Sequence, residues 1–165
     1  YGTAKRWLPE RFAATVAALA GQGLSVVLVG AADEREVARQ VCEAAVAGGA
    51  PPNLVANFAG RTSLPELLAL LSYCRLLIAN DSGPMHVAAA LGTPVVAIFG
   101  STNERQTFPL ARPGRLRLVK APNIECSPCK LRECPIDHRC MTRIGAQEVI
   151  AAARELLAAA PAPAP

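Results

Sequence analysis

The sequence predicts an α/β fold with a doubly wound parallel sheet. Two short apolar runs, 76–79 and 95–99, are bounded by glycine, proline and asparagine, and an alanine-rich segment long enough for one helix separates them. Apolar runs of this length suit strands that are covered on both faces, as in parallel sheets. Strands that alternate with helices at this spacing form βαβ units.

The other elements continue this alternation. Pro9 suits the first turn of a helix, and Ser63 followed by Glu66 is typical of a capping box. A further helix has an acidic start, which the helix dipole favours. Besides the alanine-rich crossover helix, we expect helices over 9–21, 33–47, 63–72 and 145–160, and strands over 24–29, 76–79, 95–99 and 115–119.

Length and composition indicate one folded domain. The chain has 165 residues, of which 52% are hydrophobic, which excludes a disordered chain. Its net charge is only +4, and it holds four Phe, two Tyr and one Trp. Because base stacking needs more aromatic side chains, this balance suits an anionic small molecule at least as well as nucleic acid. We expect a domain over 1–157 with no nucleic-acid partner.

The sequence carries no membrane or targeting signal. Arg75 interrupts the longest apolar run before it reaches the roughly 20 residues that a membrane span needs. The first residues lack a starting Met and a signal-peptide pattern, so the chain is expected to begin inside a longer protein. The alanine- and proline-rich end, 158–165, is expected to be a disordered tail.

The segment Asp81–Ser82–Gly83 lies between a predicted strand and a predicted helix. Open α/β sheets bind ligands at the carboxyl ends of their strands, and the free amides of a helix start bind anions. We therefore expect a phosphate-bearing ligand here. Asp81 or Ser82 could also cap the helix. His86, one turn further, suits a phosphate contact and a buried, hydrogen-bonded histidine equally well.

Four of the six cysteines fall in one irregular stretch, 120–143. They are Cys126, Cys129, Cys134 and Cys140, with His138 among them. A C-x2-C pair is typical of zinc sites, but the usual second pair is absent. A structural zinc ion, two disulfides and free thiols all remain open, although a reducing compartment disfavours disulfides. Cys42 and Cys74 are expected to be core thiols.

Four motifs are informative together. They are Lys5-Arg6-Trp7-x-Pro9, Gly30-Ala31-Ala32-Asp33-Glu34, Gly60-Arg61-Thr62-Ser63-Leu64 and Asn80-Asp81-Ser82-Gly83-Pro84-Met85-His86-Val87-Ala88-Ala89-Ala90. In order and spacing they resemble the carboxy-terminal half of lipopolysaccharide heptosyltransferases, glycosyltransferases with two facing Rossmann-like domains. The resemblance runs from Lys5 to about Leu157. It implies a Rossmann-like fold, the carboxy-terminal half of a GT-B glycosyltransferase.

The resemblance also implies which residues bind the phosphates and sugar of a donor. The Lys5 ammonium would neutralise the diphosphate, a surface lysine being the simpler alternative. Ser82 and Gly83 would bind the phosphates, and Asp81 would hold sugar hydroxyls. His86 would contact a phosphate.

For the nucleoside, the resemblance implies two residues. Glu34 would accept hydrogen bonds from the ribose hydroxyls, the alternative being an ordinary acidic helix start. Thr62 would border the adenine. The loop 101–109 should face the same cleft, with Thr102 or Asn103 near the donor and no role assigned.

The function implied is that of a donor-binding domain in an enzyme that transfers heptose from ADP-heptose to the lipopolysaccharide inner core. Such an enzyme works in the cytoplasm, with peripheral association at the inner membrane, and its catalysis needs no cofactor. The base that activates the acceptor belongs to the amino-terminal half of the family. No catalytic residue is therefore expected in this chain, which would be inactive alone.

Two other classes of function stay open. One is a domain of an epimerase or glycosyltransferase that uses another nucleotide sugar. The other is a non-catalytic module that binds a nucleotide or a metal ion.

Overall fold

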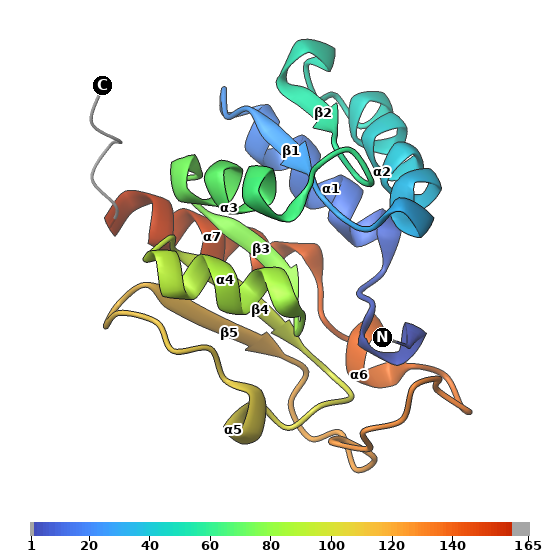
Figure 1. Cartoon of the computed structure of the whole chain (residues 1–165). Helices are drawn as coiled ribbons and strands as arrows, with labels where there is room; N and C mark the ends of the chain where they lie inside the picture. The colour runs from blue at the N-terminus through green and yellow to red at the C-terminus, as the bar shows by residue number, and fades with distance from the viewer. Residues whose placement is uncertain (1, 160–165) are drawn as a thin grey trace. The chain divides into compact units, whose positions relative to one another are not determined.

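The computed structural model describes residues 2–159 (Figure 1). Its helices are η1 (Thr3–Lys5), α1 (Pro9–Ala20), η2 (Ala32–Glu34), α2 (Arg35–Ala47), η3 (Pro52–Leu54), α3 (Leu64–Tyr73), α4 (Gly83–Leu91), α5 (Glu104–Thr107), α6 (Arg139–Thr142) and α7 (Ala146–Ala159). The strands are β1 (Val26–Leu28), β2 (Val55–Asn57), β3 (Leu77–Asn80), β4 (Val95–Phe99) and β5 (Leu116–Lys120). The chain divides into two compact units, one of Leu8–Leu67 and a larger one formed by the segments on either side of it.

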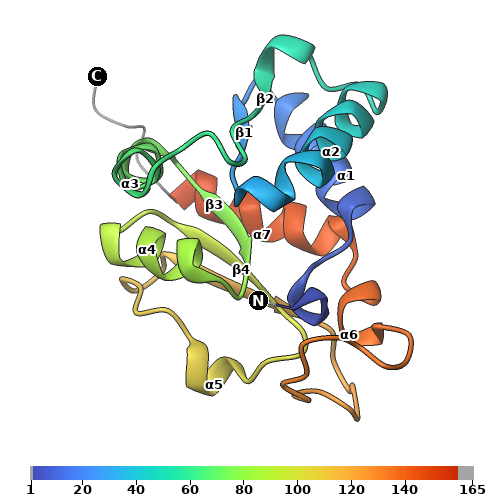
Figure 2. The same ribbon diagram turned by 45° about the vertical axis from the view of Figure 1, so that its right-hand side comes forward.

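The larger unit is built on a parallel sheet in the order β3-β4-β5. Ala79 of β3 pairs with Ala97 of β4, which pairs with Leu118 of β5. Helices α4 and α7 cover opposite faces of this sheet (Figures 1 and 2). Every residue of the central strand β4 is therefore buried.

The smaller unit pairs β1 with β2, again in parallel, and packs α1 against α2. Its core is made of small aliphatic side chains that let the helices approach closely. These are Ala13, Val16, Ala20, Val41, Ala45 and Ala50.

The predicted α/β fold with parallel strands is confirmed. β4 has the predicted bounds, and the Glu66 half of the predicted capping box forms, because the Ser63 N–H donates to the Glu66 carboxylate at 2.7 Å; the Ser63 hydroxyl donates to the same carboxylate at 2.6 Å. β1 is shorter than the predicted strand 24–29 and only half-buried. β2 was not predicted because three residues are too few to establish a strand period.

The segment between β5 and α6, residues 121–138, forms no regular element (Figure 1). At the other end of the chain, α7 extends to Ala159, two residues into the predicted tail, and residues 160–165 lie outside the described part. None of the described helices is long and apolar enough to cross a membrane.

Candidate functional site

The turn after β3 leads into a helix start that no side chain caps. The Asp81 N–H donates to the Ile98 carbonyl at 3.2 Å, which ties the turn to β4. Ser82 is the N-cap residue of α4, but within residues 2–159 no side chain makes a capping hydrogen bond there. The capping alternative is therefore wrong for the side chains of Asp81 and Ser82. Amides at an uncapped start are available to an anion.

Gly83 and His86 both face the outside of this helix start. A Cβ on Gly83 would meet nothing within 4 Å, and its φ lies outside the left-handed region. Neither packing nor backbone conformation therefore requires glycine at this position, and the backbone is open to close approach by a ligand. His86 is exposed, so the buried-histidine alternative is wrong.

A buried carboxylate lies beside the helix start. The Asp81 side chain is only 4% exposed, and its Oδ2 accepts hydrogen bonds from Lys5 Nζ at 3.0 Å and from the Thr107 hydroxyl at 3.2 Å. Lys5 Nζ also lies 3.4 Å from the Asp81 carbonyl oxygen. The structure thus places Lys5 against Asp81, beside the start of the helix that carries Ser82, Gly83 and His86.

Lys5 reaches Asp81 because the N-terminal segment is anchored beside β3. The Trp7 N–H donates to Asn80 Oδ1 at 3.1 Å. The Trp7 ring is buried, and its Nε1–H donates to the Ile144 carbonyl at 3.1 Å. Sequence analysis did not find the role of Asn80, whose only signal was its position directly before Asp81.

The loop after β4 supplies Thr107, to which the sequence gave no role. Asn103 caps α5, because its Oδ1 accepts from the Arg105 N–H at 3.0 Å. Ser101 and Thr102 are buried, and their hydroxyls have no hydrogen-bond partner in the described part of the chain. Two residues were predicted near the donor. The Thr102 hydroxyl makes no hydrogen bond within the described residues, whereas the Asn103 side chain caps α5.

Glu34 and Thr62 lie in the smaller unit, at the carboxyl ends of β1 and β2. Glu34 Oε2 accepts from the Ala31 N–H at 3.0 Å, and the Gly60 N–H donates to the Gly30 carbonyl at 2.8 Å. Gly60 has φ +65°, and a Cβ there would lie 2.7 Å from the Ala32 backbone. The turn with Glu34 and the loop with Thr62 therefore lie side by side.

The four clustered cysteines line one small cavity of about 110 Å³. Their thiols are free, Cys126 is exposed and Cys140 is buried. Burial, helped by the neighbouring thiols of Cys129, Cys126 and Cys134, raises the pKa of Cys140 to about 11. Across residues 2–159, no three His, Cys, Asp or Glu side chains are already arranged to hold a metal ion. Cys42 and Cys74 lie elsewhere and are half-buried, and burial raises the pKa of both thiols.

Fold and site together define a class of protein. Parallel strands with helices between them, an uncapped helix start after a strand, and carboxylates at strand ends are typical of α/β domains that bind nucleotides. The family model for glycosyltransferase family 9 (heptosyltransferase) matches residues 1–139. The chain belongs to that family.

Curated relatives and solved structures agree with this assignment. Lipooligosaccharide heptosyltransferase 2 of Campylobacter jejuni is 33% identical over 159 residues, which are 95% of this chain and 48% of that protein. The structure of E. coli ADP-heptose LPS heptosyltransferase II is similar, with a TM-score of 0.80 and 30% identity over 96% of this chain and 44% of that one. E. coli heptosyltransferase WaaC with ADP has the same fold, with a TM-score of 0.68 and 20% identity over 93% of this chain and 41% of that one.

The chain spans about half the length of the curated relatives it matches, or less. The structural matches confirm the predicted Rossmann-like half of a GT-B fold, and the family match confirms the resemblance.

Proposed function

We propose that this chain is the donor-binding domain of a heptosyltransferase that transfers heptose from ADP-heptose to the lipopolysaccharide inner core. The observation that carries the proposal is the Lys5–Asp81 pair beside the uncapped start of α4. A positive side chain and open helix amides at one strand end form a site for a diphosphate. The names of the relatives, which are heptosyltransferases, suggest that the sugar of the donor is heptose.

The phosphates belong at the start of α4. Ser82 and the Gly83 backbone would bind them, and His86 is exposed one turn further on the same helix. The Lys5 ammonium would neutralise the charge that develops on ADP as the leaving group. Its side chain is 18% exposed, so its charge is only partly screened by water.

The sugar belongs at Asp81. Lys5 and Thr107 both contact Oδ2 of its carboxylate, and Oδ1 makes no hydrogen bond with the described residues. Oδ1 can therefore accept from a sugar hydroxyl while Oδ2 keeps Lys5 and Thr107 in place. In this proposal Asp81 binds the sugar and positions the lysine at once.

The nucleoside belongs to the smaller unit. Glu34 would accept from the ribose hydroxyls and Thr62 would border the adenine, because the two turns that carry them lie side by side at strand ends. WaaC, a protein of the same fold, has been solved with ADP, which favours adenosine over other nucleosides.

The acceptor and its activating base form the other part of the proposal. We assign no catalytic residue to this chain, and we propose that it does not turn over donor by itself, acts in the cytoplasm and associates peripherally with the inner membrane. Lipopolysaccharide core is the proposed acceptor, as the names of the relatives suggest. The transfer itself needs no cofactor, and a zinc ion at the cysteines would be structural.

Calorimetric titration of the purified chain tests the proposal. ADP-heptose and ADP should bind, and UDP and UDP-glucose should bind at least about tenfold more weakly, because Glu34 contacts the ribose that all four share, whereas Thr62 borders the base. A preference for UDP would favour the alternative nucleotide-sugar enzyme. Binding of no nucleotide at all would contradict the proposed function.

A further inference from the structure

The segment 126–140 encloses a cavity that carries an unusual set of side chains. Its wall holds the four clustered cysteines, His138 and Ser101. The Ser101 side chain is 1% exposed, and its hydroxyl lacks a hydrogen-bond partner in the described chain. A buried hydroxyl without a partner is costly, and a bound ion or water is one way in which proteins satisfy it. Together with the four thiols, this hydroxyl makes the cavity a candidate binding site.

This segment holds the N-terminal turn that carries Lys5. The Ala4 N–H donates to the Arg132 carbonyl at 3.0 Å, and the Ala4 carbonyl lies 2.9 Å from His138 Nε2. Gly2 packs so closely that a Cβ there would lie 1.9 Å from the Arg132 carbonyl oxygen. Figures 1 and 2 both show the N-terminal turn beside α6 and the loop before it.

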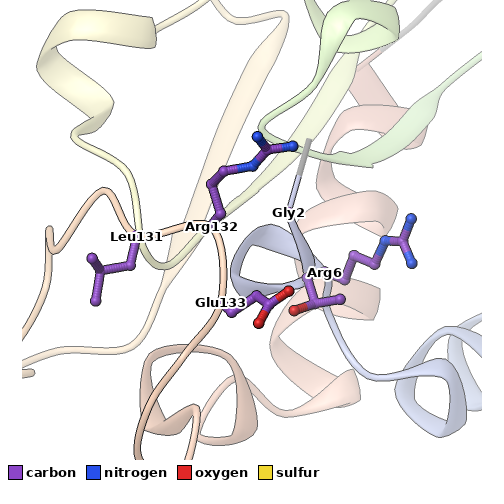
Figure 3. A pocket seen from close by; sticks show the side chains of 6 residues that line it. Gly2, Arg6, Leu131, Arg132 and Glu133 are labelled. Carbon is purple, nitrogen blue, oxygen red and sulfur yellow. The ribbon is translucent and has the colours of Figure 1, made fainter.

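A second hollow marks the line where the two segments meet. It is open, about 550 Å³ in volume, and lies between Gly2, Thr3 and Arg6 on one side and Leu131, Arg132 and Glu133 on the other. Figure 3 shows these side chains along the two neighbouring backbones. The N-terminal turn is therefore held from two sides, by the cysteine segment at Ala4 and by the buried Trp7 ring that follows it.

The same segment also holds the loop that carries Thr107. The Ser127 hydroxyl donates to the Gly100 carbonyl at 2.6 Å, and the Lys130 N–H donates to the Ser101 carbonyl at 2.7 Å. Lys130 Nζ donates to Gln106 Oε1 at 2.7 Å, one residue before Thr107. Both side chains that contact the Asp81 carboxylate are thus carried on segments held by the cysteine loop.

The loop itself has little regular structure to keep it stiff. Asn123, Lys130 and His138 adopt the left-handed conformation, with φ of 53°, 58° and 55°. Asn and His adopt this region more readily than other non-glycine residues, whereas Lys130 is held there by the bond from its N–H to the Ser101 carbonyl. Within the segment, which lies between β5 and α6, the constraint comes from hydrogen bonds to the loop after β4 and to the N-terminal turn.

We propose that Cys126, Cys129, Cys134 and Cys140 bind one soft divalent metal ion of the Zn²⁺ class, and that this ion stiffens the loop that holds Lys5 and Thr107 against Asp81. Each cysteine that binds would lose its thiol proton to solvent. Because the side chains of residues 2–159 are not arranged as a metal site as they stand, binding requires the four thiols to turn toward one another. His138 is left out of this set because its Nε2 faces the Ala4 carbonyl, and it acts as a positioning residue. The effect on the donor rests on the proposed function, whereas metal binding does not.

Metal content of the full chain tests the site directly. Protein purified with Zn²⁺ and dialysed should retain about one zinc per chain. Cys126→Ser should retain well under half of that, and because Cys126 is exposed this variant should fold. Cys74→Ser, which changes a cysteine outside the cavity, should retain the full amount. A chain that retains no zinc, or equal zinc in both variants, overturns the proposal.

Fluorescence of Trp7, the single tryptophan, reports the position of the N-terminal turn without any donor. Removal of zinc by 1,10-phenanthroline should shift its emission to longer wavelength while far-UV circular dichroism stays unchanged, because the turn loosens and the fold persists. In Cys126→Ser the chelator should have no effect. An unchanged spectrum of the zinc-loaded wild type on chelation would overturn the coupling to the N-terminal turn.

ADP affinity completes the test. Chelation should weaken ADP binding by about tenfold in the wild type and by less than twofold in Lys5→Met, because the metal acts through Lys5. Equal losses in the two proteins would overturn the coupling to Lys5. A zinc-loaded chain with the expected Trp7 shift that binds no ADP would contradict the proposed function and leave the metal site standing.

Discussion

Asp81 and Glu34 follow parallel strands in the same way, yet contacts of different range hold them. Asp81 is buried and contacts Lys5, 76 residues away, and Thr107, 26 residues away. Glu34 is half-buried and accepts from Ala31, three residues away. The Asp81 carboxylate therefore lies in a site that the tertiary fold assembles, and the Glu34 carboxylate closes its own turn through the Ala31 N–H.

Gly60, near Glu34, and Gly83, near Asp81, also differ in what requires a glycine. Gly60 is required by the protein, because its φ is +65° and a side chain would meet the Ala32 backbone at 2.7 Å. Gly83 is required by neither conformation nor packing. The glycine near Glu34 therefore serves the fold, and the glycine near Asp81 is free to serve a ligand.

The largest effect on stability is expected from Asp81→Ala. It removes the carboxylate from beside a largely buried ammonium, and breaking such a pair costs about 3 kcal/mol of unfolding free energy. Glu34→Ala should cost less, about 1 kcal/mol, because the hydrogen bond between Glu34 and the Ala31 N–H lies at a half-buried position. Urea denaturation of both variants measures the difference. Equal losses of unfolding free energy would contradict the different roles given to Asp81 and Glu34.

Gly60→Ala should lower the unfolding free energy by about 2 kcal/mol, through left-handed backbone strain and the contact with Ala32. Gly83→Ala should change it by less than about 0.5 kcal/mol and should instead weaken ADP binding several-fold. Thermal melts and calorimetric titration of the two variants check this. Unfolding of Gly83→Ala at lower temperature than Gly60→Ala would reverse the assignment.

A smaller effect is expected from Glu34→Gln on nucleotide affinity. The substitution keeps the size of the side chain but removes a charge-assisted hydrogen bond to ribose, so ADP should bind up to about tenfold more weakly. Asp33→Asn, at the neighbouring exposed carboxylate, is the matched control and should bind ADP as the wild type does. If both variants lose the same affinity, the effect is one of overall charge and Glu34 has no ribose contact.

Much of the fold could be predicted because its signals are local. The apolar run of β4 and the bond from the Ser63 N–H to the Glu66 carboxylate depend on neighbouring residues, and both are present. β2 was missed, since a three-residue strand carries no period and forms only by pairing with β1.

The site was predictable only in part, for the same reason. The turn from Asp81 to Gly83 follows from a strand that runs into a helix start. The contacts of Thr107 with Asp81 and of Asn80 with Trp7 depend on tertiary packing, which no local pattern reveals. The cysteine spacing identified a cluster, but that it holds the N-terminal turn could be seen only from the structure.

The central claim is that Lys5 and Asp81 act as one unit in binding the donor. The most direct test is a double-mutant cycle on ADP-heptose affinity, with Lys5→Met, Asp81→Asn and the double variant measured by calorimetry. If Asp81 positions Lys5, the two losses should not add, and the double variant should be at least about 1 kcal/mol better than the sum of the single losses. Losses that add to within about 0.4 kcal/mol would mean that the two residues act independently, and would contradict the claim.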